Sequence, residues 1–306
     1  MSDVTPLAAP GPPPPPGLAS PGDASSGKLL ACPVCPHACR RSERQNGICG
    51  ARGVRGGRVV SLNYGQATAL ALDPIEKKPL ARFHPGSSIL SYGSYGCNLS
   101  CNFCQNADIS TATAAQPPAT QRITPDELVE QAAALTPTGN CGIALTYNEP
   151  LIAPEFLIDT AQLAHDRGLV TVAVTNGYVN LDTWQACLAC LDAVNIDLKC
   201  FSEDGYASLD APGGLAVVKR SIETAVRAGV HVEVTTLVVP GLSDDAEAFE
   251  REVRWLATLD RNIPLHISRF FPRYQAQASS PTNPRVLHAF EAIARKHLTY
   301  VYLGNL

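Results

Sequence analysis

Six apolar, β-branched runs that alternate with helical segments constrain the fold of this chain more than any other sequence feature. The runs are SILSYGS, CGIALTY, LVTVAVT, AVNIDLK, VHVEVTTLVV and PLHISRF. They recur roughly every 25 to 40 residues, which indicates right-handed βα units and a parallel sheet. So many units in order favour a sheet that curls toward a full or partial barrel, with functional groups at the carboxyl ends of its strands.

Two of the helical segments carry sequence signals for their ends. The segment TPDELVEQAAAL begins with Thr124 as the N-cap and Pro125 at the first helical position, and Glu127 completes a capping box. The segment PEFLIDTAQLAHDRG ends at Gly168, which suits the left-handed position after a helix. These signals predict helices between the strands.

Polar residues of functional type follow most of the predicted strands. The fifth run ends instead in a Pro-Gly turn. Because the carboxyl ends of barrel strands meet at one mouth, we expect the polar strand ends to form one site. These strand-end residues are Cys97, Tyr147, Asn148, Glu149, Thr175, Asn176, Gly177, Asp197, Lys199, His266 and Arg269.

Composition argues against several classes of protein. The 306 residues carry a formal net charge of −4, which gives no electrostatic reason to expect nucleic acid or an acidic membrane as partner. No run of about 18 apolar residues predicts a membrane span. The first residues include no cation before Lys28 and no apolar core, so we expect no secretory signal and a cytoplasmic protein. Its 11 cysteines should then stay reduced, and clustered ones indicate metal ligands before disulfides.

The chain divides by composition into three predicted parts. Residues 1–28 are rich in Pro, Ala, Gly and Ser, which predicts a disordered, partly polyproline tail. Residues 29–66 form a Cys- and Gly-rich unit that we expect to bind metal. Residues 67–306 carry the strand–helix repeat and should form the barrel.

Four cysteines lie within eighteen residues of the second part, in the spacing C-x2-C-x3-C-x9-C. They are Cys32, Cys35, Cys39 and Cys49, called the quartet below. Four thiolates favour a closed structural site, which would hold a segment too small for its own core. Zinc and a second Fe–S cluster both fit, and disulfides, coincidence or His37 as a substitute ligand stay open.

Three more cysteines lie close together directly after the first strand. Cys97, Cys101 and Cys104 have the spacing C-x3-C-x2-C, and no histidine stands near them in the sequence. A closed tetrahedral site needs four ligands, so buried thiols or a zinc site with a distant ligand are alternatives. A [4Fe–4S] cluster held by three thiolates would instead keep one iron open for a ligand.

The cysteine loop also carries a family resemblance. CNLSCNFC resembles the signature of the radical S-adenosylmethionine (SAM) superfamily. LDPIEKKPL, TYNEP, VTNGY, NIDLK and HVEVTTLVVPG are similar, in this order, to motifs of the AmmeMemoRadiSam-system radical SAM enzymes, relatives of the pyruvate formate-lyase activating enzymes. The resemblance implies a partial (β/α)6 barrel of the TIM type. It also implies that Cys97, Cys101 and Cys104 ligate a [4Fe–4S] cluster, which reductively cleaves SAM to a 5′-deoxyadenosyl radical that abstracts hydrogen from a substrate.

The same resemblance implies a set of residues that contact SAM. Phe103 would face the adenine, and Glu149, in the place of a Gly-Gly-Glu-Pro turn, would hold the amino group. Simpler roles stay open for these residues. Glu149 could be a surface carboxylate and Asn176 a turn-forming residue. Asp197 and Lys199 could form a surface ion pair, and His266 could be a core histidine. The implied contacts are Phe103, Gln105, Asn148, Glu149, Asn176, Asp197, Lys199 and His266.

Three functions are compatible with this pattern. The first is an activating-enzyme-like radical SAM oxidoreductase that modifies a protein, with flavodoxin or ferredoxin as low-potential electron donor. The second acts on a small molecule or a non-glycyl side chain, together with Memo-like and AMMECR-like partners. The third, a scaffold without chemistry, is disfavoured because the three cysteines and Glu149 are intact.

Overall fold

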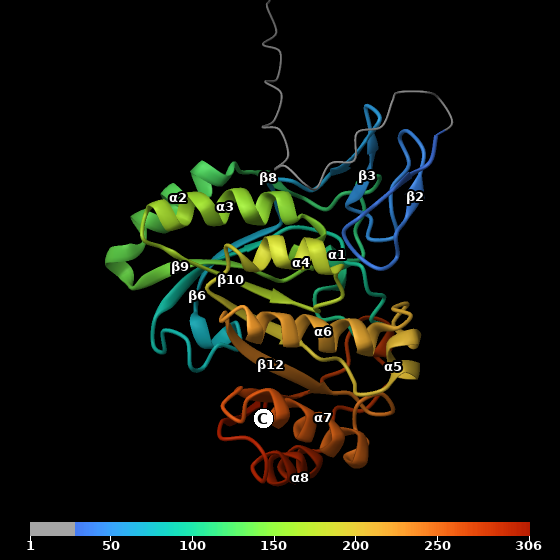
Figure 1. The fold of residues 1–306 in the computed structure, drawn as a ribbon, viewed down its shortest axis with the longest axis vertical. Helices are drawn as coiled ribbons and strands as arrows, with labels where there is room; N and C mark the ends of the chain where they lie inside the picture. Colours follow the sequence, from blue (N-terminus) through green and yellow to red (C-terminus); the bar gives the residue numbers. More distant parts are fainter. Residues whose placement is uncertain (1–27) are drawn as a thin grey trace, which may run out of the picture.

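A computed structural model describes residues 28–306 and has an eight-stranded sheet at its centre (Figure 1). Seven strands run parallel, and the edge strand β6 runs antiparallel to β7. The strand order is β14-β13-β12-β11-β10-β9-β7-β6, and no ladder in the described residues joins β14 to β6, so the barrel is partial. The strands are β6 (Ala69–Pro74), β7 (Ser88–Gly93), β9 (Asn140–Leu145), β10 (Val170–Thr175), β11 (Ala193–Asp197), β12 (His231–Val238), β13 (Leu265–Arg269) and β14 (Val301–Gly304).

The six predicted strands are confirmed as β7 and β9 to β13, and the predicted α/β partial barrel is confirmed with them. Sequence analysis did not predict the two outermost strands, β6 and β14. Only the inner edge of each is paired to a neighbour in the sheet, and β14 is also short, with four residues. An edge strand is covered less fully than a central one, so its apolar pattern is weaker.

Helices connect the parallel strands and pack on the outside of the sheet (Figure 1). The capping box of α2 is confirmed, because Thr124 and Glu127 exchange side chain–backbone hydrogen bonds. Gly168 ends α3 with φ +69°, as predicted. The helices are α1 (Ala107–Ser110), α2 (Pro125–Ala134), α3 (Pro154–Asp166), α4 (Leu181–Leu188), α5 (Glu203–Ser208), α6 (Gly214–Arg227), α7 (Ala246–Leu259) and α8 (Pro284–Ala294).

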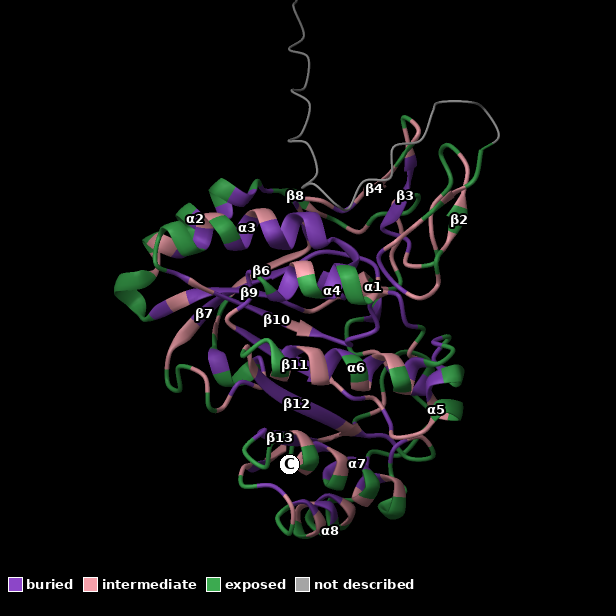
Figure 2. Cartoon of the chain, in the orientation of Figure 1, coloured by how far each residue is buried: buried purple, intermediate pink, exposed green. Residues whose placement is uncertain are grey.

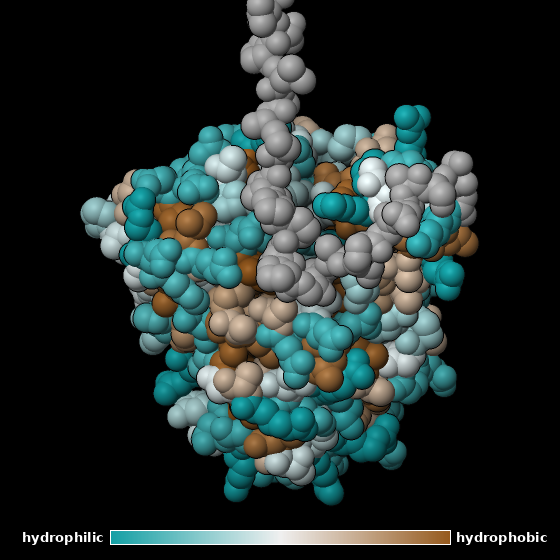
Figure 3. Space-filling view, turned by 45° about the horizontal axis from the view of Figure 1, so that its top comes forward, coloured by the Kyte–Doolittle hydropathy of each residue, from teal (hydrophilic) through white to brown (hydrophobic). Residues whose placement is uncertain are grey.

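The central strands are buried on both faces, whereas the helices are buried on one (Figure 2). This explains why the strands read as nearly continuous apolar runs rather than as alternating ones. The outward faces of the helices are largely hydrophilic, and in the view of Figure 3 apolar residues form small separate patches. Among residues 28–306, no helix is both long and apolar enough to cross a bilayer.

The segment between β6 and β7 folds under the amino ends of the strands. Ile75 and Leu80 are fully buried there. The backbone N–H groups of Ala81 and Arg82 donate to the carboxylate of Glu233 on β12, at 2.9 and 2.7 Å. This segment therefore closes one end of the barrel and leaves the carboxyl end for a site.

The Cys-rich unit precedes the barrel and contains short antiparallel pairs of strands. Arg52 reaches into the barrel domain and forms two 2.8 Å hydrogen bonds with the carboxylate of Glu155 on α3. The backbone N–H of Asn180 donates to the carbonyl of Val34 at 3.0 Å. The predicted tail, residues 1–28, lies almost entirely outside the described residues. The pairs within this unit are β1 (Leu30–Ala31) with β2 (Arg40–Arg41) and β3 (Arg52–Arg55) with β4 (Arg58–Ser61). At its end β5 (Gln66–Ala67) pairs with β8 (Gln121–Arg122), which belongs to a later part of the chain.

Candidate active site

A cavity of about 320 Å³ lies at the carboxyl ends of the parallel strands, where the sequence predicted a shared site. It is lined by the loop after β7 and by residues at the ends of β9 to β13. The barrel thus brings together residues that are far apart in the sequence. The predicted residues that line the cavity are Cys97, Cys101, Phe103, Cys104, Gln105, Asn148, Glu149, Asn176, Asp197 and Lys199.

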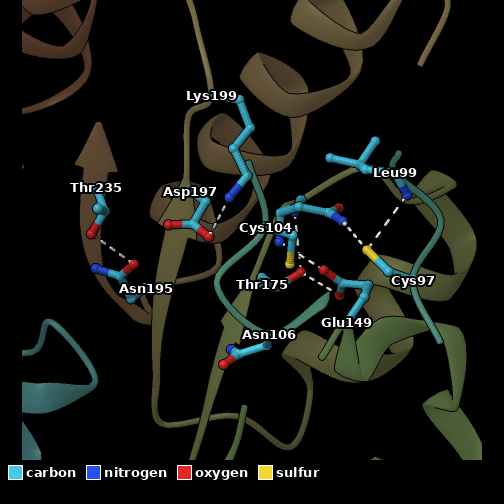
Figure 4. A network of polar contacts seen from close by, with 12 residues as sticks. Cys97, Leu99, Cys104, Asn106, Glu149, Thr175, Asn195, Asp197, Lys199 and Thr235 are labelled. Atoms are coloured by element: carbon cyan, nitrogen blue, oxygen red, sulfur yellow. Dashed lines mark hydrogen bonds and ion pairs between the residues drawn. The ribbon is translucent and has the colours of Figure 1, made fainter. Parts of the chain in front are cut away.

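The cysteine loop leaves the sheet through a tight turn at Gly96. Its φ is +87°, and a Cβ there would lie 2.5 Å from the carbonyl oxygen of Cys49, so no other residue fits. Beyond the turn, Cys97 Sγ accepts hydrogen bonds from the Leu99 backbone N–H at 3.5 Å and from Asn176 Nδ2 at 3.7 Å (Figure 4). The loop therefore orients this sulfur toward the cavity wall that β10 contributes.

Burial dominates the acid–base chemistry of these thiols. It raises the pKa of Cys97 well above its ordinary value, and the carboxylate of Glu149 raises it further. It also raises the pKa of Cys101 to about 11. Thiols with such pKa values are protonated at neutral pH, so a metal that binds them as thiolates releases protons.

Glu149 lies in the turn after β9 and is only 2% exposed. Its Oε1 accepts hydrogen bonds from Thr175 Oγ1 at 2.6 Å and from the Leu151 N–H at 2.9 Å, and its Oε2 accepts from the Asn176 N–H at 2.8 Å (Figure 4). Burial raises the pKa of this carboxyl to about 7, although the three donors lower it. The group is fixed in orientation and balanced between charged and neutral forms at neutral pH.

The side chains of two asparagines in the predicted set form hydrogen bonds with other groups of the protein. Asn148 Nδ2 donates to the carbonyls of Tyr95 and Gly96 at 3.1 Å each, and its Oδ1 accepts from the Ser94 N–H at 2.9 Å. Asn148 therefore ties the turn after β9 to the start of the cysteine loop. Asn176 does the same from β10, because its Nδ2 also donates to Asn98 Oδ1 at 2.9 Å.

Asp197 and Lys199 form an ion pair across the cavity from Glu149, with Nζ and Oδ2 2.8 Å apart (Figure 4). Burial lowers the pKa of Lys199, but Asp197 and the nearby thiol of Cys101 outweigh that effect, so the pKa lies above its ordinary range. The Lys199 ammonium therefore stays charged at the edge of the cysteine loop.

Residues 91–253, slightly more than half of the chain, match the family model of the Radical SAM superfamily. The chain belongs to this superfamily. The matched region runs from β7 into α7 and so includes the cysteine loop and the strand ends that line the cavity. The expected membership is confirmed, whereas the narrower resemblance to AmmeMemoRadiSam-system enzymes stays a prediction.

Individual relatives agree with this membership. The chain is 36% identical to an uncharacterized protein of Methanocaldococcus jannaschii, over 90% of this chain and 81% of that one. It is 29% identical to the pyruvate formate-lyase-activating enzyme of Clostridium pasteurianum, over 55% of this chain and 67% of that one. The crystal structure of Streptococcus suis SuiB bound to S-adenosylmethionine covers 69% of this chain and is itself 48% covered, with a TM-score of 0.53 at 10% identity. This last similarity concerns the fold alone.

Radical SAM membership implies a [4Fe–4S] cluster and SAM as cofactors, and the cavity residues fit both. Cys97, Cys101 and Cys104 offer three soft sulfur donors from one loop that lines the cavity. Glu149 and Lys199, of opposite charge, line the same cavity and match the ammonium and carboxylate that an amino acid carries. The volume of the whole cavity, about 320 Å³, is of the size that a single small ligand needs.

His266 is the predicted SAM contact that does not line the cavity. It stands on β13 two residues before Ser268, which does, so its side chain lies one layer deeper in the barrel. Its Nε2 lies 2.6 Å from Glu233 Oε2, and its ring stacks on Tyr302 at 5.2 Å between centroids. Burial raises the pKa of Glu233, but His231, His266 and two backbone N–H groups outweigh it and hold the pKa at about 2. The packing thus matches the alternative of a core histidine with its polar atoms satisfied.

Tyr147, an expected residue of the site, belongs to a polar cluster whose other members, Asp73 and Lys78, were not predicted from the sequence. Lys78 Nζ donates to Asp73 Oδ2 at 2.8 Å and to the Tyr147 hydroxyl at 3.3 Å, and it lies 4.4 Å from the centre of the Tyr147 ring. The Tyr147 hydroxyl in turn donates to Asp73 Oδ2 at 2.6 Å. The charged residues within LDPIEKKPL were the only sequence signal for this cluster. Nothing in the sequence indicates that this motif lies beside TYNEP, which contains Tyr147.

The quartet lines a second, much smaller cavity of about 20 Å³ in the Cys-rich unit. Cys39 Sγ accepts a hydrogen bond from the Ile48 N–H at 3.4 Å, and burial raises the pKa of Cys35 to about 12. Within residues 28–306, no group of three or more His, Cys, Asp or Glu side chains is arranged to hold a metal ion. The metal of the quartet therefore stays a prediction.

The absence of a group arranged around one metal ion does not argue against a cluster at the three barrel thiols. In a [4Fe–4S] cluster each thiolate binds a different iron, so these thiols need not converge on one point.

Proposed function

We propose that this protein is an enzyme that holds a [4Fe–4S] cluster through Cys97, Cys101 and Cys104 and binds SAM beside it. When bound, the two groups together supply reductive cleavage of SAM to methionine and a 5′-deoxyadenosyl radical, which abstracts hydrogen from a substrate. One observation carries the proposal: three thiols on a single loop line the same barrel cavity as the oppositely charged Glu149 and Lys199.

In this proposal Glu149 binds the amino group of SAM. Its carboxylate is held by donors from three residues, so little conformational freedom is lost when a ligand binds. Because its pKa is about 7, an adjacent ammonium ion would shift the carboxyl to its charged form and make a charge-assisted hydrogen bond.

The other predicted contacts divide into binding and positioning residues. Lys199 uses one N–H on Asp197, and an ammonium carries three, so it is suited to the carboxylate of SAM. Phe103 and Gln105 line the cavity from the cysteine loop. Asn176, which donates toward Cys97 Sγ, acts on the thiol that it orients and is a positioning residue in this account.

The size of the cavity supports a protein as the substrate. Its volume of about 320 Å³ lies at the low end for one ligand of drug size, and SAM is such a ligand. With SAM bound, a substrate can insert only a small group, as a protein does when it presents one residue. This agrees with the activating-enzyme-like function that the first hypothesis states, and it requires a low-potential donor such as flavodoxin or ferredoxin.

The test is SAM cleavage by protein reconstituted with iron and sulfide without oxygen. We expect about four irons at the barrel site and 5′-deoxyadenosine when a low-potential reductant is added. Cys101→Ala should abolish 5′-deoxyadenosine formation, because a cluster held by two thiolates is not retained. Cys141→Ala, which removes a thiol outside the cavity, is the matched control and should stay active. Sustained wild-type rates from Cys101→Ala would refute the proposal.

We also propose a second, structural metal site at Cys32, Cys35, Cys39 and Cys49. The four thiols line one cavity, and its volume of about 20 Å³ suits a body the size of one water molecule. That size favours a single ion such as zinc over a second Fe–S cluster, and because the thiols do not already surround a metal position within residues 28–306, binding would draw their side chains together. Elemental analysis of the purified protein before reconstitution tests this, and one equivalent of zinc is the expected result.

A further inference from the structure

Two lysines that line the active-site cavity, on the segment that follows β6, lie beside one carboxylate at the end of β6. Lys77 Nζ is 3.3 Å from Asp73 Oδ1, and Lys78 Nζ is 2.8 Å from Asp73 Oδ2. Both lysines line the cavity. Two ammonium groups therefore share one carboxylate, and one positive charge is left uncompensated within the cluster. In contrast, Lys199 and Asp197 balance one another.

Tyr147 is built into this cluster by an unusual backbone conformation. Its φ is +71°, in the left-handed region that a residue with a large side chain rarely adopts. A Cβ on Gly93 would lie 2.7 Å from Tyr147 Cδ2, so this glycine makes room for the ring. Asn106 Nδ2, from the cysteine loop, donates to the Tyr147 carbonyl at 2.8 Å. The ring is thus held against β7, and its hydroxyl reaches Asp73 and Lys78.

The lysines of the cluster belong to the segment between β6 and β7, which folds under the amino ends of the strands, and they line the cavity from that side. The residues that line the cavity include Lys77 and Lys78, which follow β6, and Asn305, which follows β14. β6 and β14 are the two outermost strands of the sheet.

We propose that Lys77, Lys78 and Tyr147 form a subsite for an anionic group of the substrate, a carboxylate or a phosphate. The inference rests on the function proposed above and names the chemistry of the group that must lie near the reacting atom. Lys78 is held in place by Asp73 and by the Tyr147 ring, so it offers a preoriented donor. Lys77, with a side chain 67% exposed, contributes the uncompensated charge.

The arrangement favours an anion over a neutral or cationic group. A cation would lie against two ammonium groups with only a carboxylate that both already use. The Tyr147 ring and hydroxyl contact the Lys78 ammonium but carry no formal charge, so the cluster keeps its net positive charge. An anion would complete the cluster as two cations between two anions.

The test measures binding of glutarate and of pyrophosphate to reconstituted, SAM-loaded enzyme by calorimetry. We expect saturable binding of at least one of the two, and Lys78→Met should weaken it by about tenfold to a hundredfold. Lys219→Met removes a lysine from the outer helix α6 and should leave the affinity unchanged. Binding of glutarate alone identifies a carboxylate, and binding of pyrophosphate alone identifies a phosphate.

Lys78→Met leaves Asp73 short of a partner and could unfold the protein, so Lys77→Met is measured in parallel. Its side chain is largely exposed, and we expect about threefold to tenfold weaker binding. Failure of wild-type enzyme to bind either anion, or equal affinity in both lysine variants and wild type, overturns the subsite. Failure of the wild type to form 5′-deoxyadenosine refutes the proposed function instead, and anion binding by the same preparation keeps the two results distinct.

Discussion

The two cysteine groups of this protein differ most in the space beside them. The three barrel thiols line a cavity of about 320 Å³ together with charged and polar side chains from five strands. The quartet lines a cavity of about 20 Å³ whose other walls include Val34, Val54 and Ile152. The barrel thiols have room for a ligand beside them, whereas the quartet has room only for a single ion or water molecule.

This difference in space suggests different roles for the two cysteine groups, one catalytic and one structural. A site that transforms a ligand needs an open coordination position and charged groups to orient the ligand. In the function proposed here, the three thiols, Glu149 and Lys199, which line one cavity, would meet this need. A site that stabilises a small unit needs a full set of ligands, and in the structural metal site that we propose the four thiols of the quartet would supply them. The numbers of cysteines in the two loops thus match the spaces that the fold leaves for them.

The largest effect is expected where the Cys-rich unit is held to the barrel. Arg52→Met should lower the free energy of unfolding by about 3–5 kcal/mol, because it leaves the buried carboxylate of Glu155 without its partner. Arg254→Met breaks an exposed pair on α7 and should cost only about 0.3–0.5 kcal/mol. Denaturant unfolding measures both. Equal stability of Arg52→Met and wild type would mean that this contact does not hold the unit in place.

A smaller change in free energy is expected for SAM binding at the barrel site. Glu149→Ala should weaken SAM binding by about 1.5–3 kcal/mol, roughly ten- to over a hundredfold, because a charge-assisted hydrogen bond is lost. Glu250→Ala, on the exposed surface of α7, is the control. Equilibrium binding to reconstituted protein gives the affinities. Unchanged SAM affinity in Glu149→Ala would mean that another residue contacts the amino group of SAM.

The smallest effect is the pH dependence of the same contact. Burial raises the pKa of Glu149 to about 7, so below pH 7 the carboxyl must lose a proton before it can pair with an ammonium. SAM affinity should therefore fall by about tenfold from pH 8 to pH 6. Titration of SAM itself persists in Glu149→Gln, so the difference between the two pH curves isolates this residue. Parallel curves would contradict the assignment.

Periodicity predicted the central sheet well because parallel strands buried on both faces are nearly continuous apolar runs. The cysteine loop, Glu149 and the Asp197–Lys199 pair were found for the same reason, since each directly follows such a run. His266 shows the limit of this reasoning. Alternation along a strand tells which face a side chain occupies, and it does not tell how deep in the barrel that residue lies.

The Asp73–Lys78–Tyr147 cluster could not be predicted from the sequence. Tyr147 lies 74 residues from Asp73, and its side chain is aimed by a positive φ that no local signal announces. Gly93 contributes only by the absence of a side chain. Such a cluster depends on how three separate segments pack, which local patterns do not encode.

The central claim, that the open and closed cysteine sites are independent, is tested most directly by elemental analysis with Mössbauer spectra. Wild type, Cys35→Ser and Cys101→Ala are compared after reconstitution. We predict that Cys35→Ser loses the metal of the Cys-rich unit and some stability but keeps the barrel iron, and that Cys101→Ala does the reverse. Loss of barrel iron in Cys35→Ser, or an iron with an open coordination position at the quartet, would contradict this account.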